Sequence, residues 1–251
     1  MLRVILSGCN GKMGRVITDI INKRDDAVIV AGVDLDLSQN GPFPVFRKFT
    51  DINCEADVII DFSNSAVLES LLSFAVNKKM PCVIATTGFS DTQVEQIKKA
   101  SEEIPVFFSF NMSLGINLLA ELCAKAASIL DGFDIEIIEK HHNQKVDAPS
   151  GTAILLYNEI NNQLQGKMKP EYDRHPKREK RSNNEIGIHA VRGGTIVGEH
   201  EVIFAGRDEI ITLSHSARSK EVFAVGAVNA AFFLKDKSAG IYSMKELVAE
   251  K

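Results

Sequence analysis

Short apolar runs alternate with amphipathic stretches from residue 1 to about residue 111. The runs have the length of buried strands and fall at 2–6, 27–33, 58–60, 82–85 and 105–108. Between them, the stretches 13–23, 66–76 and 91–102 place apolar residues at helical spacing. Short buried strands separated by helices predict βαβ units and a parallel sheet.

The pattern changes after Asn111. It predicts a long helix over 116–130 that ends near Gly132, because glycine readily adopts the left-handed conformation of a helix cap. A strand is expected over 133–140, and a further helix is expected to begin near Ser150.

Apolar strands then follow at 186–191, 195–204 and 209–215 without helices between them. The turn at 206–208 predicts a hairpin, so this second sheet is expected to be at least partly antiparallel. The stretch 221–234 is again helical in pattern. The predicted fold class is α/β, with a Rossmann-type parallel-sheet domain and a smaller α/β domain whose sheet is mixed and largely antiparallel.

Composition narrows the function classes. The chain has 251 residues, 45% of them hydrophobic and 25% charged, as in an ordinary globular protein. Its net charge of −4 argues against a nucleic-acid partner, so an anionic ligand must be held by local positive groups. No signal sequence and no apolar run of about 18 residues is visible, so we expect a cytoplasmic protein without membrane contact.

The cysteines also bear on the class of protein. They lie far apart, with no CxxC pair, at Cys9, Cys54, Cys82 and Cys123. This spacing favours a reduced, intracellular chain and predicts no structural metal.

A basic segment, 166–184, stands apart because it has few apolar residues. Its cations are Lys167, Lys169, Arg174, Lys177, Arg178, Lys180 and Arg181. We considered a flap over an anionic ligand and a solvated surface loop, and the pattern favours the surface loop.

A glycine motif follows the first predicted strand and opens the first helix. In this GxxGxxG spacing, Gly8 permits a tight turn, Gly11 lets the backbone approach a pyrophosphate, and Gly14 lets helix and strand pack closely. The spacing departs from GxGxxG, but its place between strand and helix predicts a dinucleotide site.

An acidic residue stands where such sites bind ribose. Asp34 ends the second strand about 20 residues after Gly14, as expected for a carboxylate that binds the ribose hydroxyls of NAD. No Arg or Lys follows at once, which favours NADH over NADPH. Lys12 in the glycine loop leaves use of both cofactors open.

Later strand ends carry small or polar residues, and ligands of open α/β sheets bind at those ends. We expect a nicotinamide ribose near Ala85, Thr86 and Thr87, and the carboxamide near Ser109 and Asn111.

The densest candidate chemistry lies between 139 and 152. His141 and His142 leave a strand, Lys145 adds a positive charge, and Ser150 is a plausible N-cap. The amides of Gly151 and Thr152 then suit a carboxylate, and a histidine can supply a proton near neutral pH.

Two other interpretations of this loop fit less well. Adjacent histidines project in opposite directions from an extended chain, which disfavours a metal site. Ser150 lacks the GxSxG context of a nucleophile. The loop therefore predicts the binding and protonation of a small carboxylate-bearing substrate.

These residues resemble the 4-hydroxy-tetrahydrodipicolinate reductase (dihydrodipicolinate reductase) family over nearly the full length. The segments that carry the resemblance are 8–14, 61–63, 85–89, 111–117 and, most specifically, 139–152. The chain departs from the family at Asn143 and Gln144, where members often carry Arg and His.

The resemblance implies two domains. Residues 1–112 and 218–251 would form the dinucleotide-binding domain, and 113–217 a substrate-binding domain that also forms a homotetramer. It implies that the residues contacting NADH or NADPH are Gly8, Asn10, Gly11, Lys12, Met13, Asp34, Ala85, Thr86, Thr87, Ser109, Phe110, Asn111 and Met112.

The resemblance also implies roles in the second domain. His141 would donate a proton, Lys145 would be its catalytic partner, and His142, Gly151 and Thr152 would hold the substrate carboxylates, with Ser150 beside them. The implied reaction reduces 4-hydroxy-tetrahydrodipicolinate to tetrahydrodipicolinate with loss of water, in lysine and diaminopimelate biosynthesis. The hydride comes from the nicotinamide.

Two alternatives remain at this point. A different Rossmann dehydrogenase of amino-acid metabolism would use the same first domain, so only the 139–152 loop separates the two. A non-catalytic NAD(H)-sensing module would bind the cofactor but would give no purpose to that loop.

Overall fold

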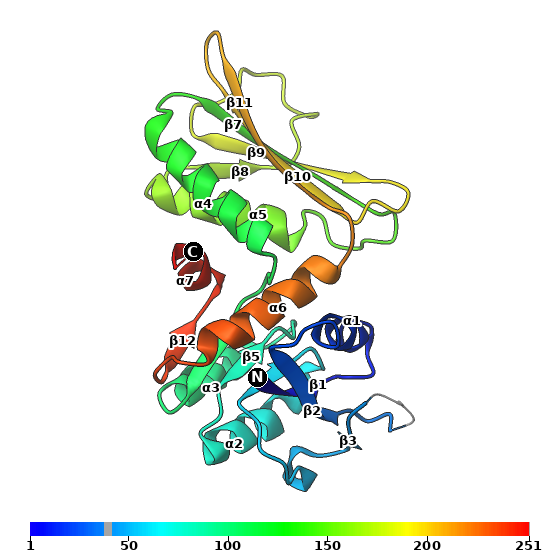
Figure 1. Cartoon of the computed structure of the whole chain (residues 1–251). Coiled ribbons are helices and arrows are strands. Elements are labelled where there is room, and N and C mark those ends of the chain that lie inside the picture. Colours follow the sequence, from blue (N-terminus) through cyan, green and yellow to red (C-terminus); the bar gives the residue numbers. More distant parts are fainter. Residues whose placement is uncertain (38–41, 251) are drawn as a thin grey trace. The chain divides into compact units, whose positions relative to one another are not determined.

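The chain folds into two compact units. The computed structural model describes residues 1–37 and 42–250. Unit 1 comprises 1–114 and 220–251, and unit 2 comprises 115–219 (Figure 1). The domain boundaries expected from the sequence were 112/113 and 217/218, and the boundaries of the two units lie at 114/115 and 219/220.

Unit 1 is built on a parallel sheet of seven strands in the order β12-β6-β5-β4-β1-β2-β3. The strands are β1 (Leu2–Ser7), β2 (Ala27–Val33), β3 (Val45–Phe46), β4 (Val58–Asp61), β5 (Cys82–Ile84), β6 (Pro105–Phe108) and β12 (Gly240–Tyr242). The predicted Rossmann-type parallel sheet is confirmed. β3 and β12 were not predicted, because runs of two and three residues leave no periodic signal.

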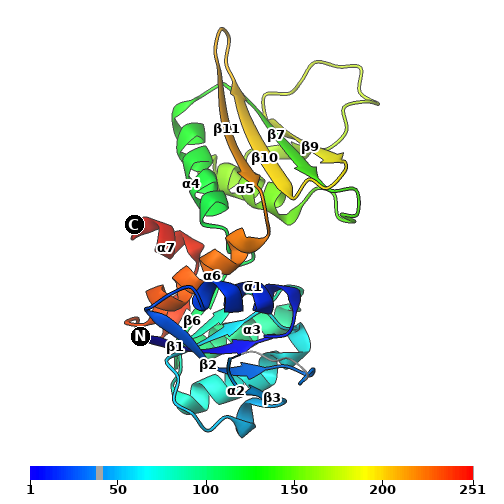
Figure 2. The same cartoon turned by 45° about the vertical axis from the view of Figure 1, so that its right-hand side comes forward.

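Helices cover both faces of this sheet (Figure 2). α1 (Lys12–Ile21) and α6 (Glu221–Leu234) pack on one face, where they share a core with Leu2, Val4 and Leu6. α2 (Leu68–Lys78) and α3 (Asp91–Ser101) pack on the other face with Ile5. Alternate side chains of β1 therefore enter different cores, as a strand buried on both faces requires.

The C-terminal segment completes unit 1. α6 carries small residues toward its neighbours, and a Cβ at Gly226 would lie only 1.6 Å from the Met112 carbonyl oxygen. The close approach at Gly226, together with the core that α6 shares with β1, packs the C-terminal segment against residues 1–114. The remaining short elements are η1 (Phe49–Asp51), η2 (Ser65–Val67) and α7 (Met244–Ala249).

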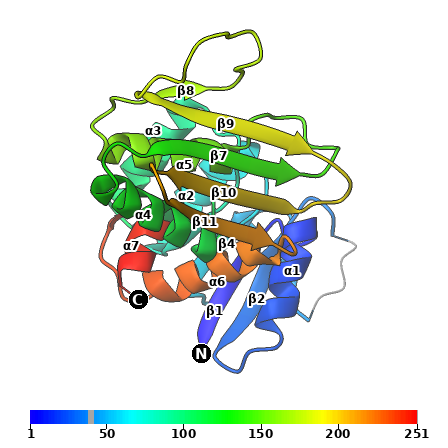
Figure 3. The same cartoon turned by 90° about the horizontal axis from the view of Figure 1, so that it is seen from above.

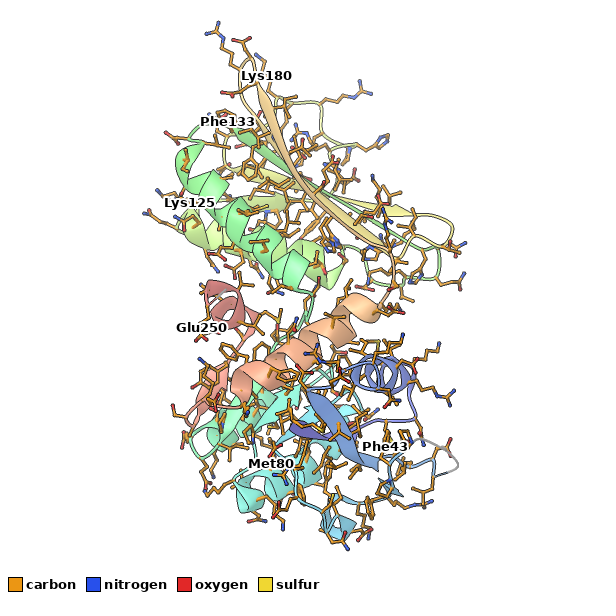
Figure 4. All side chains as sticks on the ribbon, viewed as in Figure 1. Phe43, Met80, Lys125, Phe133, Lys180 and Glu250 are labelled. Atoms are coloured by element: carbon orange, nitrogen blue, oxygen red, sulfur yellow. The ribbon has the colours of Figure 1, made fainter. Side chains whose placement is uncertain are left out.

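Packing also fixes the start of β3 beside β2. Phe43, labelled in Figure 4, and Cys9 fill the space above Gly32, where a Cβ would lie 2.8 Å from Cε2 of Phe43 and 2.6 Å from Sγ of Cys9. The residues after β3 are consequently held next to the end of β2.

Unit 2 has a five-stranded sheet in the order β11-β10-β7-β9-β8 (Figure 3). Its elements are α4 (Leu114–Ile129), β7 (Asp134–His141), α5 (Gly151–Gln163), β8 (Lys169–Glu171), β9 (Glu185–Arg192), β10 (Gly198–Ala205) and β11 (Ile210–Ala217).

The sheet of unit 2 is mixed, as predicted, but its antiparallel part is smaller than expected. β10 pairs antiparallel with β7 and β11, whereas β9 pairs parallel with β7 and β8. β7 and β9 can run parallel because the chain crosses through α5 between them, and the connection 172–184 returns the chain for the parallel pair β8 and β9. The predicted hairpin is present, with the Gly206 N–H donating to the Glu209 carbonyl at 2.9 Å.

The core of unit 2 lies between this sheet and helices α4 and α5. Ile135 and Ile137 of β7 are buried in it, and Glu139 follows them on the same face with no exposed surface. Because a strand alternates its faces, the His141 side chain leaves β7 on that face as well. None of the helices in 1–37 and 42–250 is long and apolar enough to cross a membrane.

Candidate active site

The glycine loop after β1 is shaped by close backbone approach. Gly8 has a φ of +77°, and a Cβ there would lie 2.5 Å from the Phe62 carbonyl oxygen. A Cβ at Gly14 would lie 2.1 Å from the Gly8 carbonyl oxygen. Only glycine fits either position, because each contact is with rigid main chain.

This loop presents the N-terminus of α1. Gly11 is the N-cap and supplies no side-chain hydrogen bond to the helix, while Lys12 and Met13 form its first turn. The first N–H groups of a helix have no partner within it, and the helix dipole favours negative charge there. The loop therefore suits a phosphate group.

Asp34 stands directly after β2 beside the glycine loop. One carboxylate oxygen accepts the Asn10 N–H at 2.9 Å and the other accepts the Asp36 N–H at 3.1 Å. These two bonds fix the carboxylate at the end of the strand. Remaining lone pairs are available to ribose hydroxyls.

A cavity of about 1010 Å³ opens at the carboxyl ends of β1, β2 and β4. Among its lining residues are Gly8, Asn10, Gly11 and Asp34. It lies where the strand order reverses between β1 and β4, the place where open α/β sheets bind dinucleotides. The glycine cradle, the helix N-terminus and the carboxylate fit the adenosine and pyrophosphate part of a nicotinamide dinucleotide.

The predicted nicotinamide-side residues do not line that cavity. Ala85 and Met112 are buried among hydrophobic core residues, so they offer only backbone to a ligand. Phe110 is 73% exposed, and the Ser109 hydroxyl donates to the Asn111 carbonyl at 3.0 Å.

A buried carboxylate ties two of these strand ends together. Asp61, at the end of β4, accepts the Ser63 hydroxyl at 2.5 Å and the Thr86 hydroxyl at 2.7 Å. Burial raises the pKa of Asp61, although both hydroxyls partly offset the effect. The sequence pattern marked 61–63 as a strand end but gave no sign of this cross-strand role. Thr86 lies on the later strand end with Thr87, which is exposed.

In unit 2, His141 is paired with a fully buried carboxylate. Its Nδ1 lies 2.6 Å from Oε2 of Glu139, and the His141 side chain is only 11% exposed. The other oxygen, Oε1, accepts the Ser150 N–H at 3.0 Å. Glu139 thus links the histidine to the beginning of α5.

Arg192 completes this arrangement from the neighbouring strand. It pairs with His141 in the β7–β9 register and donates to both Glu139 oxygens at 2.7 Å. Burial alone would raise the pKa of Glu139, but the hydrogen bonds from Arg192 and His141 hold that pKa below its usual range. The carboxylate is therefore ionised and accepts a hydrogen bond from the Nδ1–H group of His141.

Ser150 is the N-cap of α5, as predicted. Its hydroxyl accepts the Ala153 N–H at 3.2 Å and lies 3.1 Å from Nε2 of His200. His200 is buried on β10, and its ring lies 5.2 Å from the His141 ring. Burial lowers the pKa of His200 to about 4, so this ring is neutral near pH 7.

Lys145 pairs with an acid of its own loop, whereas His141 pairs with the buried Glu139. Its ammonium lies 2.8 Å from a carboxylate oxygen of Asp147, and its backbone N–H donates to the His142 carbonyl at 3.1 Å. The ion pair with Lys145 lowers the pKa of Asp147. The described partner of the lysine is thus an acid of the same loop. Asn143 and Gln144 beside it are exposed.

Several buried nitrogen atoms near His141 have no partner among the described residues. They are Nδ1 of His142, Nε of Arg192 and Nδ1 of His200. Gly151, the first residue of α5, is exposed and has open space where a Cβ would be. Thr152 follows it in the first turn. Polar nitrogens of this kind suit the oxygens of a carboxylate ligand.

The basic segment 166–184 is tied to its own unit. Arg174 pairs with Glu185, and Lys177 pairs with Glu171. Arg181 donates to Asp134 at 2.7 Å and to Glu136 at 3.0 Å. These cations pair with acids of β7, β8 and β9, and strand β8 itself lies within the segment, so it is not a loop throughout.

The sequence did not single out Glu139, Arg192 or His200 for these roles. Glu139 carried one signal that was available, since this acid follows Ile135 and Ile137 on the core-facing positions of its strand. Arg192 and His200 lie on later strands, and only sheet pairing brings them to His141. Within the described part of the chain, no cluster of three or more His, Cys, Asp or Glu residues could hold a metal ion.

Two family models match the chain, one in its N-terminal part and one in its C-terminal part. A family model described as dihydrodipicolinate reductase, N-terminus, matches residues 2–112, and another described as dihydrodipicolinate reductase, C-terminus, matches 115–248. The chain is 52% identical over 248 residues to the 4-hydroxy-tetrahydrodipicolinate reductase of Caldanaerobacter subterraneus subsp. tengcongensis, covering 99% of this chain and 98% of that protein.

Two further matches agree. The 4-hydroxy-tetrahydrodipicolinate reductase of Clostridium tetani is 50% identical over 97% of this chain and 96% of its own length. A solved structure of dipicolinate-bound dihydrodipicolinate reductase from Paenisporosarcina sp. TG-14 has a TM-score of 0.83, with 24% identity over 98% of this chain and 99% of that chain, and so shares the fold. With both family models matching and relatives about half identical over nearly the full length, the chain belongs to the dihydrodipicolinate reductase family.

Proposed function

We propose that this chain reduces 4-hydroxy-tetrahydrodipicolinate to tetrahydrodipicolinate, with loss of water, and that His141 protonates the substrate. The reaction is that of its full-length relatives in lysine and diaminopimelate biosynthesis. The observation that carries the role of His141 is its 2.6 Å contact with the buried Glu139, which fixes one ring nitrogen and leaves the other for chemistry.

The hydrogen bond sets which nitrogen exchanges protons. Because Glu139 is ionised and accepts from Nδ1, the proton that leaves the imidazolium comes from Nε2. Gly198 leaves room beside that atom, since a Cβ there would lie 3.1 Å from it. His141 is thus equipped to give a proton to a carbon atom of a bound substrate, directly or through water.

The substrate is a dianion, and the surrounding groups suit its charge. We assign its carboxylates to His142, to the Gly151 and Thr152 amides at the start of α5, and to the Lys145 ammonium. Lys145 would exchange its partner Asp147, 59% of whose side chain is exposed, for the substrate. A positive charge and oriented amides stabilise the negative charge that develops in the ring during reduction.

The reductant is NAD(P)H, which supplies a hydride when it is bound. In unit 1 the glycine loop would hold its pyrophosphate and Asp34 its adenosine ribose. We assign the nicotinamide half and the phosphates of the cofactor to the other predicted contacts, which are Lys12, Met13 and the segments 85–87 and 109–112. A carboxylate at Asp34 favours NADH.

We also propose that the chain forms a homotetramer through unit 2. The support is family membership together with apolar side chains on the sheet, where Val191 and Ile210 are 44% and 68% exposed. Light scattering of the purified protein tests this. A monomeric mass at micromolar concentration would contradict it.

The reaction is tested by supplying the condensation product of pyruvate and aspartate semialdehyde and following the loss of reduced nicotinamide absorbance. We expect substrate-dependent oxidation by the wild type and a strong loss in His141→Gln. Oxidation with aspartate semialdehyde alone would indicate another amino-acid dehydrogenase. Cofactor binding without any oxidation would indicate a sensing module, and either result would overturn the proposal.

A further inference from the structure

The end of the sheet next to Asp34 carries a basic residue that the sequence places far away. β3 pairs in parallel with β2, with Phe46 opposite Val33, and the Asp34 N–H donates to the Phe46 carbonyl at 3.1 Å. Asp34 is the first residue after β2, and Arg47 is the first residue after β3. The carboxylate and the guanidinium therefore leave neighbouring strands at the same edge.

We propose that Arg47, assisted by Lys48, is the residue that binds the 2′-phosphate when the bound nicotinamide dinucleotide is NADPH. The inference rests on the proposed function, because it assigns the adenosine ribose to Asp34. Arg47 would then determine how strongly this chain prefers one nicotinamide dinucleotide over the other.

Geometry supports this role in two ways. A terminal nitrogen of Arg47 lies 3.5 Å from the carbonyl oxygen of Leu35, the residue that follows Asp34. Arg47 and Lys48 also line the same cavity as Gly8, Asn10 and Asp34. A phosphate on the ribose held by Asp34 would therefore lie within the part of the cavity that these cations border.

The negative charge of Asp34 is partly balanced by backbone N–H groups, which lowers its repulsion of a nearby phosphate. Each Asp34 oxygen already accepts a backbone N–H, from Asn10 or from Asp36, so part of its negative charge is balanced. A guanidinium next to it offsets the repulsion between that carboxylate and a phosphate. Arginine is also the side chain best matched to phosphate, because it donates two parallel hydrogen bonds.

The sequence pattern alone favours NADH over NADPH. Sites that accept the 2′-phosphate commonly show an arginine near the ribose-binding acid, and here Leu35 and Asp36 follow Asp34. The short strand β3 supplies the arginine from a separate segment. Its two residues are too few to be recognised before the sheet is known.

The test compares ligand affinities by calorimetry, without substrate. The probes are NADPH, NADH and the fragments 2′,5′-ADP and 5′-AMP. For Arg47→Ala we expect the Kd of NADPH and of 2′,5′-ADP to rise about 10- to 100-fold, as for a lost hydrogen bond to a charged group. The Kd of NADH and of 5′-AMP should change less than about threefold, because those ligands lack the phosphate.

Two further variants sharpen the comparison. Arg47→Lys keeps the charge and should recover part of the NADPH affinity, whereas Lys23→Ala removes an exposed cation outside the cavity and should leave both cofactors unaffected. The proposal is overturned if Arg47→Ala weakens NADH and NADPH equally, or if the wild type binds 2′,5′-ADP no better than 5′-AMP. Because these are binding measurements, they stand even if the proposed reduction is not observed.

Discussion

The Glu139 carboxylate lies 2.6 Å from Nδ1 of His141 and also accepts both terminal nitrogens of Arg192 at 2.7 Å. A carboxylate without exposed surface is stable there only because these groups and the Ser150 N–H use its oxygens. Arg192 and the Ser150 N–H hold the carboxylate in place, and the carboxylate in turn fixes the orientation of the His141 ring. The proton transfer that we propose for His141 therefore depends on this buried carboxylate.

Replacing this carboxylate by an amide should impair turnover through His141. In Glu139→Gln the neutral amide stabilises the protonated imidazole less, so kcat should fall about 10- to 100-fold. Steady-state kinetics with saturating substrate and cofactor measure this loss.

Strand β7 offers a matched control for that variant. Glu136 also contacts a histidine, with its Oε2 lying 2.8 Å from Nε2 of His189, but it is on the other face of the strand. Glu136→Gln should leave kcat within about twofold of wild type, because the contacts of Glu136 lie on the face of β7 away from His141. Equal losses in the two variants would show that Glu139 has no special part in proton transfer.

Removing the Lys145 ammonium should weaken substrate binding and slow turnover. Lys145→Ala should raise KM for the substrate and lower kcat, about tenfold or more in kcat/KM, since a charged contact to a carboxylate is lost. KM for the reduced nicotinamide should not change. An unchanged substrate KM would remove Lys145 from the carboxylate site.

The buried His200 should make unit 2 less stable in acid. Its pKa in the folded protein is about 4, whereas an unfolded histidine titrates near 6.5. The unfolded chain therefore binds the extra proton between these values, so the free energy of unfolding should fall as pH decreases from about 6.5 to about 4, by up to about 3 kcal/mol.

Urea titrations in a series of buffers measure this dependence. His200→Asn has no titrating ring and should lose that part of the slope, whatever its effect on absolute stability. If the variant keeps the full wild-type slope between pH 6.5 and pH 4, another group is responsible.

The tight glycine contact in unit 1 should be intolerant of a methyl group. Gly14→Ala would force a Cβ to within 2.1 Å of the Gly8 carbonyl oxygen, so we expect a loss of about 2 kcal/mol or more and much weaker nucleotide binding. Gly193→Ala, where a Cβ meets nothing within 4 Å, is the control. Thermal unfolding with and without NADH checks both variants, and equal behaviour would contradict the packing argument.

Much of this architecture could be predicted from the sequence because its main elements have strong periodicity. The strand at 105–108, the helix at 221–234 and the Ser150 N-cap appear where the pattern placed them. The glycine loop could be interpreted because Gly8 and Gly14 stand where the backbone leaves no room for a Cβ.

Contacts between side chains on different strands could not be predicted from the hydrophobic pattern of the sequence. Arg192 and His200 reach Glu139 only through the order β10-β7-β9, and β3 brings Arg47 to Asp34 although it spans two residues. Local periodicity records neither strand order nor register. The even division between parallel and antiparallel pairs in unit 2 was missed for the same reason.

Protonation of the substrate by His141 is tested by comparing kcat of the wild type and of His141→Gln, with the condensation product of pyruvate and aspartate semialdehyde as substrate. The rate of the variant should be lower by about 10²–10⁴, because the proton donor is lost while the cofactor site is unchanged. A variant that keeps the wild-type rate would show that another group supplies the proton.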